Sequence, residues 1–220
     1  RHSFPTRRSS DLRHKGFIPW DDDIDVGMPR EDYERFLQIA QKECGEEYFL
    51  QTVDTDPEYH LYFAKLRMNR TRFVENSLQK SGSVTGFYID IFPYEGYMIP
   101  WLQHFAAKLS CVVNFDLAGR HPRLAQVGYN ILHYAVFPMF RAIGHVFGNS
   151  DLYMHSYGAW FYERNPKRIM IPHKDIIFEG HTFEGPADPE ELCRIAYGNY
   201  MDLPPHDKRD RHKVEIVFHD

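Results

Sequence analysis

Apolar and polar positions alternate with two periods along the chain, which predicts mainly strands in its first half and mainly helices in its second. Short runs rich in aromatic and branched residues predict strands over residues 24–28, 48–52, 59–68, 72–75 and 87–92, the last ended by Pro93. Apolar residues at helical spacing predict a helix over residues 29–44, which begins at Pro29 and ends before Gly45.

The second half is dominated by helical spacing. It predicts helices over residues 101–117, 124–147 and 152–162, with Pro138 kinking or splitting the second. Strands are predicted at 168–171 and 176–183. A last helix begins at Asp188-Pro189 and ends at Tyr197, where Gly198 forms a left-handed cap. These elements together predict an α+β, or mixed α/β, fold.

The longest uncharged stretch covers residues 124–140. It includes polar residues and is shorter than the ~20 apolar residues that a membrane span needs. We therefore expect a core or interfacial helix there.

Composition limits the class of protein. The chain has 220 residues, of which 43% are hydrophobic and 26% charged, and this excludes a disordered chain and a collagen-like repeat. The net charge of −5 gives no global basic field, so nucleic acid is not an expected partner. Three cysteines without C-x-x-C spacing favour buried thiols in a reducing compartment, which predicts a cytoplasmic protein.

Residues 1–12 do not resemble the rest of the chain. The DNA of a short-read sequencing adaptor, translated in one frame, encodes residues 3–12, so we interpret 1–12 as a foreign scar that replaces the natural start. A basic disordered tail is the alternative. Without the scar the net charge is −7, and we expect one domain over residues 13–220 with a helical insertion at 101–165.

Four aspartates lie within five residues, in the run Trp20-Asp-Asp-Asp-Ile-Asp-Val26. On a strand, Asp21, Asp23 and Asp25 would share one face. Such closely spaced carboxylates repel each other unless a cation lies between them, and Mg²⁺ or Mn²⁺ prefers these oxygen ligands. The run therefore predicts a divalent-metal site. A solvated acidic turn is the alternative, whereas an EF-hand is excluded because it would need glycine at Val26 and glutamate at Asp32.

A further carboxylate, Asp90, lies in the middle of the strand predicted at residues 87–92. An unpaired carboxylate is costly to bury in such a strand. One interpretation is a core aspartate satisfied by the backbone. The other, which we favour, is that Tyr88, Asp90 and Phe92 face the same cleft as Asp23 and Asp25, where three carboxylates would hold one or two metals for phosphoryl transfer.

Three segments together resemble the LicD family of cholinephosphotransferases, which is related to fukutin-type transferases. They are Arg13-His-Lys-Gly-Phe-Ile-Pro-Trp-Asp-Asp-Asp-Ile-Asp-Val-Gly-Met-Pro-Arg30, then Ile89-Asp-Ile-Phe-Pro93, then Tyr197-Gly-Asn-Tyr-Met-Asp-Leu-Pro-Pro205. The resemblance implies a nucleotidyltransferase-like mixed sheet flanked by helices.

The resemblance also implies roles for individual residues. The family's metal dyad corresponds to Asp23 and Asp25, its third carboxylate to Asp90, and Asp21 is the first acidic residue of the run. Further residues are expected to contact the substrate: Arg13 and Lys15 at the donor pyrophosphate, and more weakly Lys65, Arg67, Arg70 and His212. For Lys65, Arg67 and Arg70, side chains on a solvent-exposed strand face are the simpler interpretation. His212 either contacts the substrate or lies on the surface.

The implied reaction transfers phosphocholine, or a similar phospho-alcohol, from a CDP-choline-like donor to a sugar hydroxyl of a cell-surface glycan such as lipopolysaccharide or teichoic acid. Because such acceptors are lipid-linked, peripheral attachment to the inner face of the membrane is expected, through residues 124–147 with Arg123 and Arg141 near their ends.

Three alternatives stay open. A metal-dependent glycosyltransferase is the first, because it also uses an Asp-x-Asp pair. A comparison of turnover with UDP-sugars and with CDP-choline would distinguish it. A nucleotidyltransferase would release pyrophosphate rather than CMP. A nucleotide-binding relic is the third, because the family's Gly-rich phosphate-binding turn lies just before the position of Arg13-His14, where this chain has the adaptor-like residues.

Overall fold

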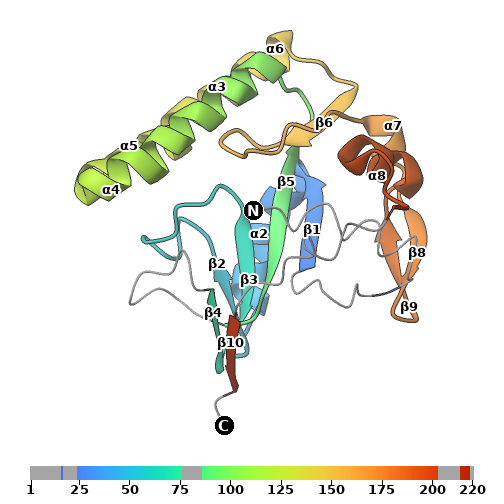
Figure 1. Cartoon of the computed structure of the whole chain (residues 1–220), viewed down its shortest axis with the longest axis horizontal. Coiled ribbons are helices and arrows are strands. Elements are labelled where there is room, and N and C mark those ends of the chain that lie inside the picture. Colours follow the sequence, from blue (N-terminus) through green and yellow to red (C-terminus); the bar gives the residue numbers. More distant parts are fainter. Residues whose placement is uncertain (1–15, 17–23, 76–85, 203–213, 219–220) are drawn as a thin grey trace.

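The computed structural model describes residues 16, 24–75, 86–202 and 214–218. These residues form a mixed sheet, a long helix packed on one face of it, a layer of helices above it and two small two-stranded sheets (Figure 1). The α+β class predicted from the sequence is confirmed. Residues 1–12, interpreted as a scar, lie outside the described residues.

The main sheet has six strands: β1 (Ile24–Pro29), β2 (Tyr48–Gln51), β3 (Ala64–Met68), β5 (Tyr88–Glu95), β6 (Leu152–His155) and β7 (Asn165–Pro166). The order is β2-β3-β5-β6-β7, and β1 pairs with the other edge of β5. The β1–β5 pairing is parallel, whereas every other pairing described in this sheet is antiparallel.

Helix α2 (Arg30–Glu43) follows β1 directly and covers one face of the sheet. Its buried residues Tyr33 and Ala40 pack with Leu50, Ala64 and Ile91 from three neighbouring strands. Alternate residues of a strand point to opposite faces, so the other face of the same strands is left to a different set of side chains. That second face carries the candidate site.

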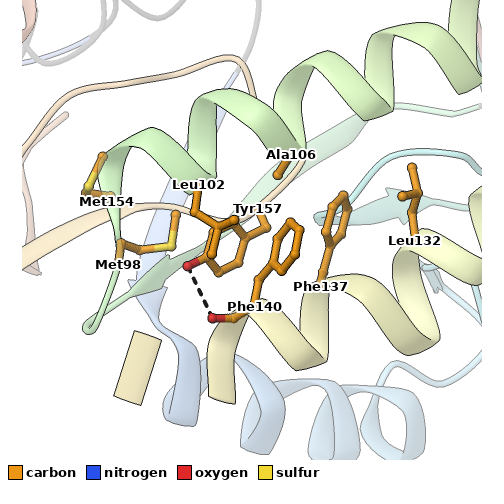
Figure 2. Packing of buried hydrophobic residues seen from close by; sticks show 8 residues of the cluster. All are labelled: Met98, Leu102, Ala106, Leu132, Phe137, Phe140, Met154 and Tyr157. Atoms are coloured by element: carbon orange, nitrogen blue, oxygen red, sulfur yellow. Dashed lines mark hydrogen bonds between the residues drawn. The ribbon is translucent and has the colours of Figure 1, made fainter. Parts of the chain in front are cut away.

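The helical layer consists of α3 (Pro100–Cys111), the π-helical turn η1 (Val112–Leu117), α4 (Ala118–Arg120), α5 (Pro122–Ile131), the π-helical turn η2 (Leu132–Val136) and α6 (Phe137–Phe147). A cluster of buried apolar side chains joins α3, α6 and the segment around β6, and its members include Leu102, Ala106, Phe137 and Phe140 (Figure 2). The helices predicted at 101–117 and 124–147 are confirmed.

Pro138 lies in the second position of α6, directly after η2. Because proline has no amide hydrogen and its ring clashes with the preceding turn, a regular α-helix cannot continue through it unchanged. The turn before α6, η2, is π-helical rather than α-helical, so the prediction that the helix is interrupted near Pro138 is confirmed. Among the described residues, no helix is long and apolar enough to cross a membrane.

The remaining elements are short. They are β4 (Thr71–Glu75) paired with β10 (Val214–Phe218), α7 (Lys167–Met170), the hairpin of β8 (Lys174–Phe178) and β9 (His181–Gly185), and α8 (Pro189–Tyr197). Asp188 caps α8 as predicted, because its Oδ1 accepts a hydrogen bond of 3.0 Å from the amide of Glu191. Gly198 ends α8 with the expected positive φ of 63°, although its ψ of −113° lies outside the left-handed helical region.

Five predictions of secondary structure were wrong in part. Residues 59–63 precede β3 as irregular chain, residues 152–155 form strand β6 rather than a helix, and 168–170 are helical in α7 rather than extended. The strand predicted at 176–183 is instead a hairpin, with a turn at 179–180 between β8 and β9. Strand β5 was predicted to end before Pro93 but continues through it. On the edge of β5 that pairs with β3 and then with β6, the pairing with β3 stops at Ile91 and the pairing with β6 starts at Tyr94. Pro93 lies between these two pairings, where this edge does not need an amide donor.

Cys44, Cys111 and Cys193 form no disulfide bond with one another. Cys193 is fully buried, as predicted, whereas Cys44 and Cys111 are only partly buried.

Candidate active site

Asp25 and Asp90 lie side by side in the main sheet. In the parallel β1–β5 pairing Asp25 is the register partner of Asp90, and neighbouring strands are about 4.8 Å apart. Register partners point to the same face, and both aspartates are half-buried there. The structure thus brings together two of the carboxylates singled out from the sequence, on the face that α2 leaves uncovered.

Lys65 is the next residue in this row. It is the register partner of Asp90 on the antiparallel strand β3, and its Nζ lies 2.5 Å from Asp90 Oδ1. The ammonium also lies 3.5 Å from the centre of the Tyr88 ring, at cation–π distance. Lys65 is 7% exposed and Arg67 6%, because side chains of the two neighbouring strands lie against them on the same face, the Tyr88 ring against both and Gln51 against Arg67. The solvated-face interpretation was therefore wrong for Lys65 and Arg67, whereas Arg70 is exposed in the turn after β3.

Arg67 belongs to a buried hydrogen-bond network beside this row. Its Nε donates to Gln51 Oε1 at 2.6 Å and its Nη1 donates to the carbonyl of Gly86 at 3.0 Å. Gln51 Nε2 in turn donates to Asp56 Oδ2 at 2.6 Å. Burial lowers the pKa of Arg67 from its usual value, which nearby Tyr59 and carboxylates partly offset. The network holds the Arg67 guanidinium in one orientation, because its donors are used by fixed acceptors.

Aromatic rings border the row on the side of β6. Phe92, two residues after Asp90 on the same face, packs 4.3 Å from the ring centre of Phe63 and 5.7 Å from that of His155. The ring centre of Phe161 lies 4.9 Å from that of His155. These rings form an apolar wall next to charged groups, and interactions between charges are stronger where water is excluded.

Sequence reasoning did not identify Gln51, Asp56, Phe63 or His155. Gln51 and Asp56 look like ordinary loop and strand-end residues, and nothing in their spacing marks them. Phe63 and His155 come from segments whose secondary structure was assigned wrongly, so their side of the sheet could not be deduced.

Five of the predicted site residues lie outside the described residues, and their roles stay predictions: Arg13, Lys15, Asp21, Asp23 and His212. Among the described residues, no group of three or more His, Cys, Asp or Glu side chains is placed to hold a metal ion. The described donors at this face are the carboxylates of Asp25 and Asp90. Their chemistry suits Mg²⁺, which needs only one or two carboxylates when water and phosphate oxygens complete its shell.

A second polar cluster lies on the opposite side of the sheet. Glu95, at the end of β5, lies five positions after Asp90, and this odd offset places it on the opposite face, the one that α2 covers. Its Oε1 accepts a hydrogen bond of 2.5 Å from Arg30 Nη2 and lies 3.7 Å from Arg141 Nη1. These contacts tie α2, β5 and α6 together beside a pocket of about 160 Å³.

Comparison with known proteins gives two matches. Residues 11–109 match the family model described as LicD/FKTN/FKRP, nucleotidyltransferase domain. Lipopolysaccharide cholinephosphotransferase LicD of Haemophilus influenzae is 30% identical over 229 residues, a match that covers 94% of this chain and 84% of that protein. The family-model match includes β1, β3 and β5, the strands that carry Asp25, Lys65 and Asp90.

Proposed function

The chain belongs to the LicD family, and from this premise we propose that it transfers phosphocholine, or a similar phospho-alcohol, from a CDP-activated donor to a sugar hydroxyl of a cell-surface glycan. The observation that carries the proposal is the row of Asp25, Asp90 and Lys65 across three neighbouring strands. Two carboxylates and an ammonium on one sheet face provide the charges that phosphoryl transfer needs.

The metal of the proposed reaction is Mg²⁺ or Mn²⁺. Asp25 and Asp90 would hold it together with Asp23, and Asp21 is a further candidate ligand. Such an ion would supply positive charge that offsets the negative charge developing on the donor phosphates. The β1–β5 register supports this proposal, because it places one carboxylate from each of two adjacent strands side by side. Mg²⁺ is commonly bound by one or two carboxylates.

The side chains around the carboxylates have separate tasks in this proposal. Lys65 fixes the orientation of Asp90 through its 2.5 Å contact and adds positive charge near the donor phosphates. Arg67, held by Gln51 and Gly86, adds a second positive charge in a fixed place. Arg13 and Lys15 are proposed to contact the donor pyrophosphate, and His212 the substrate.

The proposed transfer is a single displacement at phosphorus. The oxygen of the sugar hydroxyl attacks the donor phosphorus that carries the alcohol, and the bond from that phosphorus to the bridging pyrophosphate oxygen breaks. CMP leaves with the bridging oxygen, and the hydroxyl proton passes to a carboxylate of the site or to water. The products are a phosphodiester on the glycan and CMP, and we propose that the reaction takes place in the cytoplasm.

The test is to incubate the purified chain with CDP-choline, Mg²⁺ and a lipopolysaccharide acceptor, and to identify the nucleotide product. We expect CMP and choline-labelled glycan, and we expect both to disappear when the metal is chelated. Release of pyrophosphate would instead identify a nucleotidyltransferase. Turnover of UDP-sugars but not of CDP-choline would identify a glycosyltransferase, and nucleotide binding without product would identify a relic.

Asp25→Asn is the decisive variant, since it keeps the size of the side chain and removes its charge. Asp175→Asn is the matched control, because Asp175 is also a strand aspartate but lies in the separate β8–β9 hairpin. Loss of CMP release in the first variant and not in the second supports the assignment. Equal activity in both would contradict it.

A further inference from the structure

Half of the exposed large apolar side chains among the described residues lie in the helical layer. Of the 24 large apolar side chains that are exposed among the described residues, twelve lie between Trp101 and Phe147. Leu124, Val127, Ile131 and Tyr134 recur at intervals of three and four residues, which places them on one stripe of α5 and η2, and each is more than half exposed. Exposed apolar patches larger than a few hundred Å² mark interaction surfaces.

The same helices are anchored by their other side. Leu132, Phe137 and Phe140 are buried in the cluster that joins α6 to α3 (Figure 2). On α3, Trp101 and Phe105 are exposed while Leu102 and Ala106 are buried. The Phe105 ring lies 6.3 Å from that of Phe140, so the exposed stripe of α3 borders α6. These helices can therefore offer only their outer sides to a partner, and they must lie flat against it.

The charge of this layer is opposite to that of the rest of the chain. Residues 100–147 contain Lys108, Arg120, Arg123 and Arg141 but a single acid, Asp116, which gives a net charge of +3 in a chain of net charge −5. Arg120, His121 and Arg123 are exposed at the tip where α4 meets α5, and this tip extends beyond the sheet (Figure 1). Arg141 points inward to Glu95 instead.

We propose that the outer surface of the α3–α6 layer docks on a bilayer that contains anionic lipid, with the apolar stripe at the boundary of headgroups and acyl chains and the tip arginines on lipid phosphates. Amphipathic helices with large apolar and basic residues bind in this way. Trp101 and Tyr134, each more than half exposed, are the aromatic types that favour this depth. The proposal rests on this surface alone and does not depend on the transfer reaction.

A second copy of the chain fits this surface less well. A symmetric dimer uses the same patch on both copies, so it would bring two basic surfaces together. An anionic membrane instead matches both the apolar stripe and the charge, and each basic residue near such a surface contributes to binding.

The experiment is flotation of the full chain with vesicles of phosphatidylcholine alone and of phosphatidylcholine with about one-third phosphatidylglycerol. We expect binding to the anionic vesicles, weaker binding to the neutral ones, and a decrease as salt rises. Ile131→Glu should lower the partition coefficient about tenfold or more, because it removes an apolar contact and adds a like charge.

Ile39→Glu is the control, since Ile39 and Ile131 are both helical isoleucines with an exposed fraction of 53% and Ile39 lies in α2, outside the layer. It should bind vesicles like the unchanged chain. A second variant, Arg120→Glu with Arg123→Glu, should lower binding to anionic vesicles and leave binding to neutral ones nearly as before; circular dichroism checks that each variant is folded. Failure of the unchanged chain to bind anionic vesicles would overturn the proposal, as would an equal loss in Ile39→Glu. The proposal would also fail if the chain did not bind vesicles but formed a dimer that Ile131→Glu dissociates. The surface would then be a contact between two copies.

Discussion

Asp25 and Asp90 are register partners on the two parallel strands of the main sheet, although 64 residues separate them in the sequence. The relationship depends on α2, which carries the chain from the end of β1 across one sheet face and returns it to the opposite edge through β2. The helix buries its apolar side on that face, so the carboxylates are left on the other face. The same packing that stabilises the sheet therefore also places the candidate site.

Asp25→Asn should abolish binding of Mn²⁺, used as a spectroscopic substitute for Mg²⁺. The amide is nearly isosteric with the carboxylate but has no negative charge and only one ligand oxygen, so hard cations bind it weakly. We expect the thermal midpoint of the variant to stay close to that of the unchanged chain. Electron paramagnetic resonance titration measures the free Mn²⁺, with Asp175→Asn as control. Unchanged affinity in Asp25→Asn would rule out Asp25 as a ligand.

Lys65→Met should destabilise the fold by about 3 kcal/mol, since removal of one partner from a buried ion pair leaves the other charge poorly compensated. The side chains of Lys65 and Asp90 are 9% and 13% exposed, so water can screen the remaining carboxylate only slightly. Urea unfolding measures the loss. Asp90→Asn in the same chain should restore part of it, because the carboxylate charge is then gone. Strictly additive losses in the double variant would show that the two residues do not interact.

Alkaline pH should destabilise the protein through its buried tyrosines. Burial raises the pKa of Tyr157 to about 12, and burial likewise raises the pKa of Tyr62 to about 12. In the unfolded chain these groups titrate near pH 10. Their contribution is present below about pH 10 and is lost as the pH rises toward 12, at about 1.4 kcal/mol per pH unit for each tyrosine. Urea unfolding at several pH values measures the slope, and Tyr157→Phe should make it shallower. The same slope in that variant would contradict the assignment.

Two glycines of the helical layer should respond to alanine in opposite ways. A Cβ atom on Gly144 would lie 2.0 Å from the carbonyl oxygen of Tyr97, so Gly144→Ala should cost about 1–3 kcal/mol despite the better helix propensity of alanine. No atom lies within 4 Å of a Cβ built on Gly119 in α4, so Gly119→Ala should stabilise by about 0.5–1 kcal/mol. Thermal unfolding of the two variants decides the signs, and a stabilised Gly144→Ala would show that α6 can shift away from Tyr97.

The sequence predicted well those features that depend on local pattern. The acidic run and the apolar spacing of residues 29–44 placed β1 and α2 correctly, and the Asp188-Pro189 pair placed the start of α8. The prediction that Asp25 and Asp90 share a face is confirmed by their register. It could be made because an unpaired carboxylate is costly to bury between Ile89 and Ile91, which favoured a shared face with the other aspartates.

Features that depend on long-range contacts could not be predicted. The segment Leu152–His155 is too short to distinguish helical from extended spacing, and it becomes a strand because it pairs with the end of β5. Lys65 and Arg67 look like solvent-facing strand residues, yet Tyr88 of β5 packs against both and Gln51 of β2 accepts a hydrogen bond from Arg67. Gln51 matters as the acceptor of Arg67, and Asp56 as the acceptor of Gln51, relationships that no local pattern contains.

The parallel pairing of β1 with β5 also bears on the order in which the protein folds. A ribosome must synthesise residue 90 before Asp25 can meet its partner, and closing so long a loop is slow compared with forming the helices. Metal affinity that needs Asp25 and Asp90 together should therefore develop late in refolding, after most of the helical circular dichroism signal has returned. The acidic run alone carries only part of the proposed ligand set, so the complete site exists only once β1 has paired with β5.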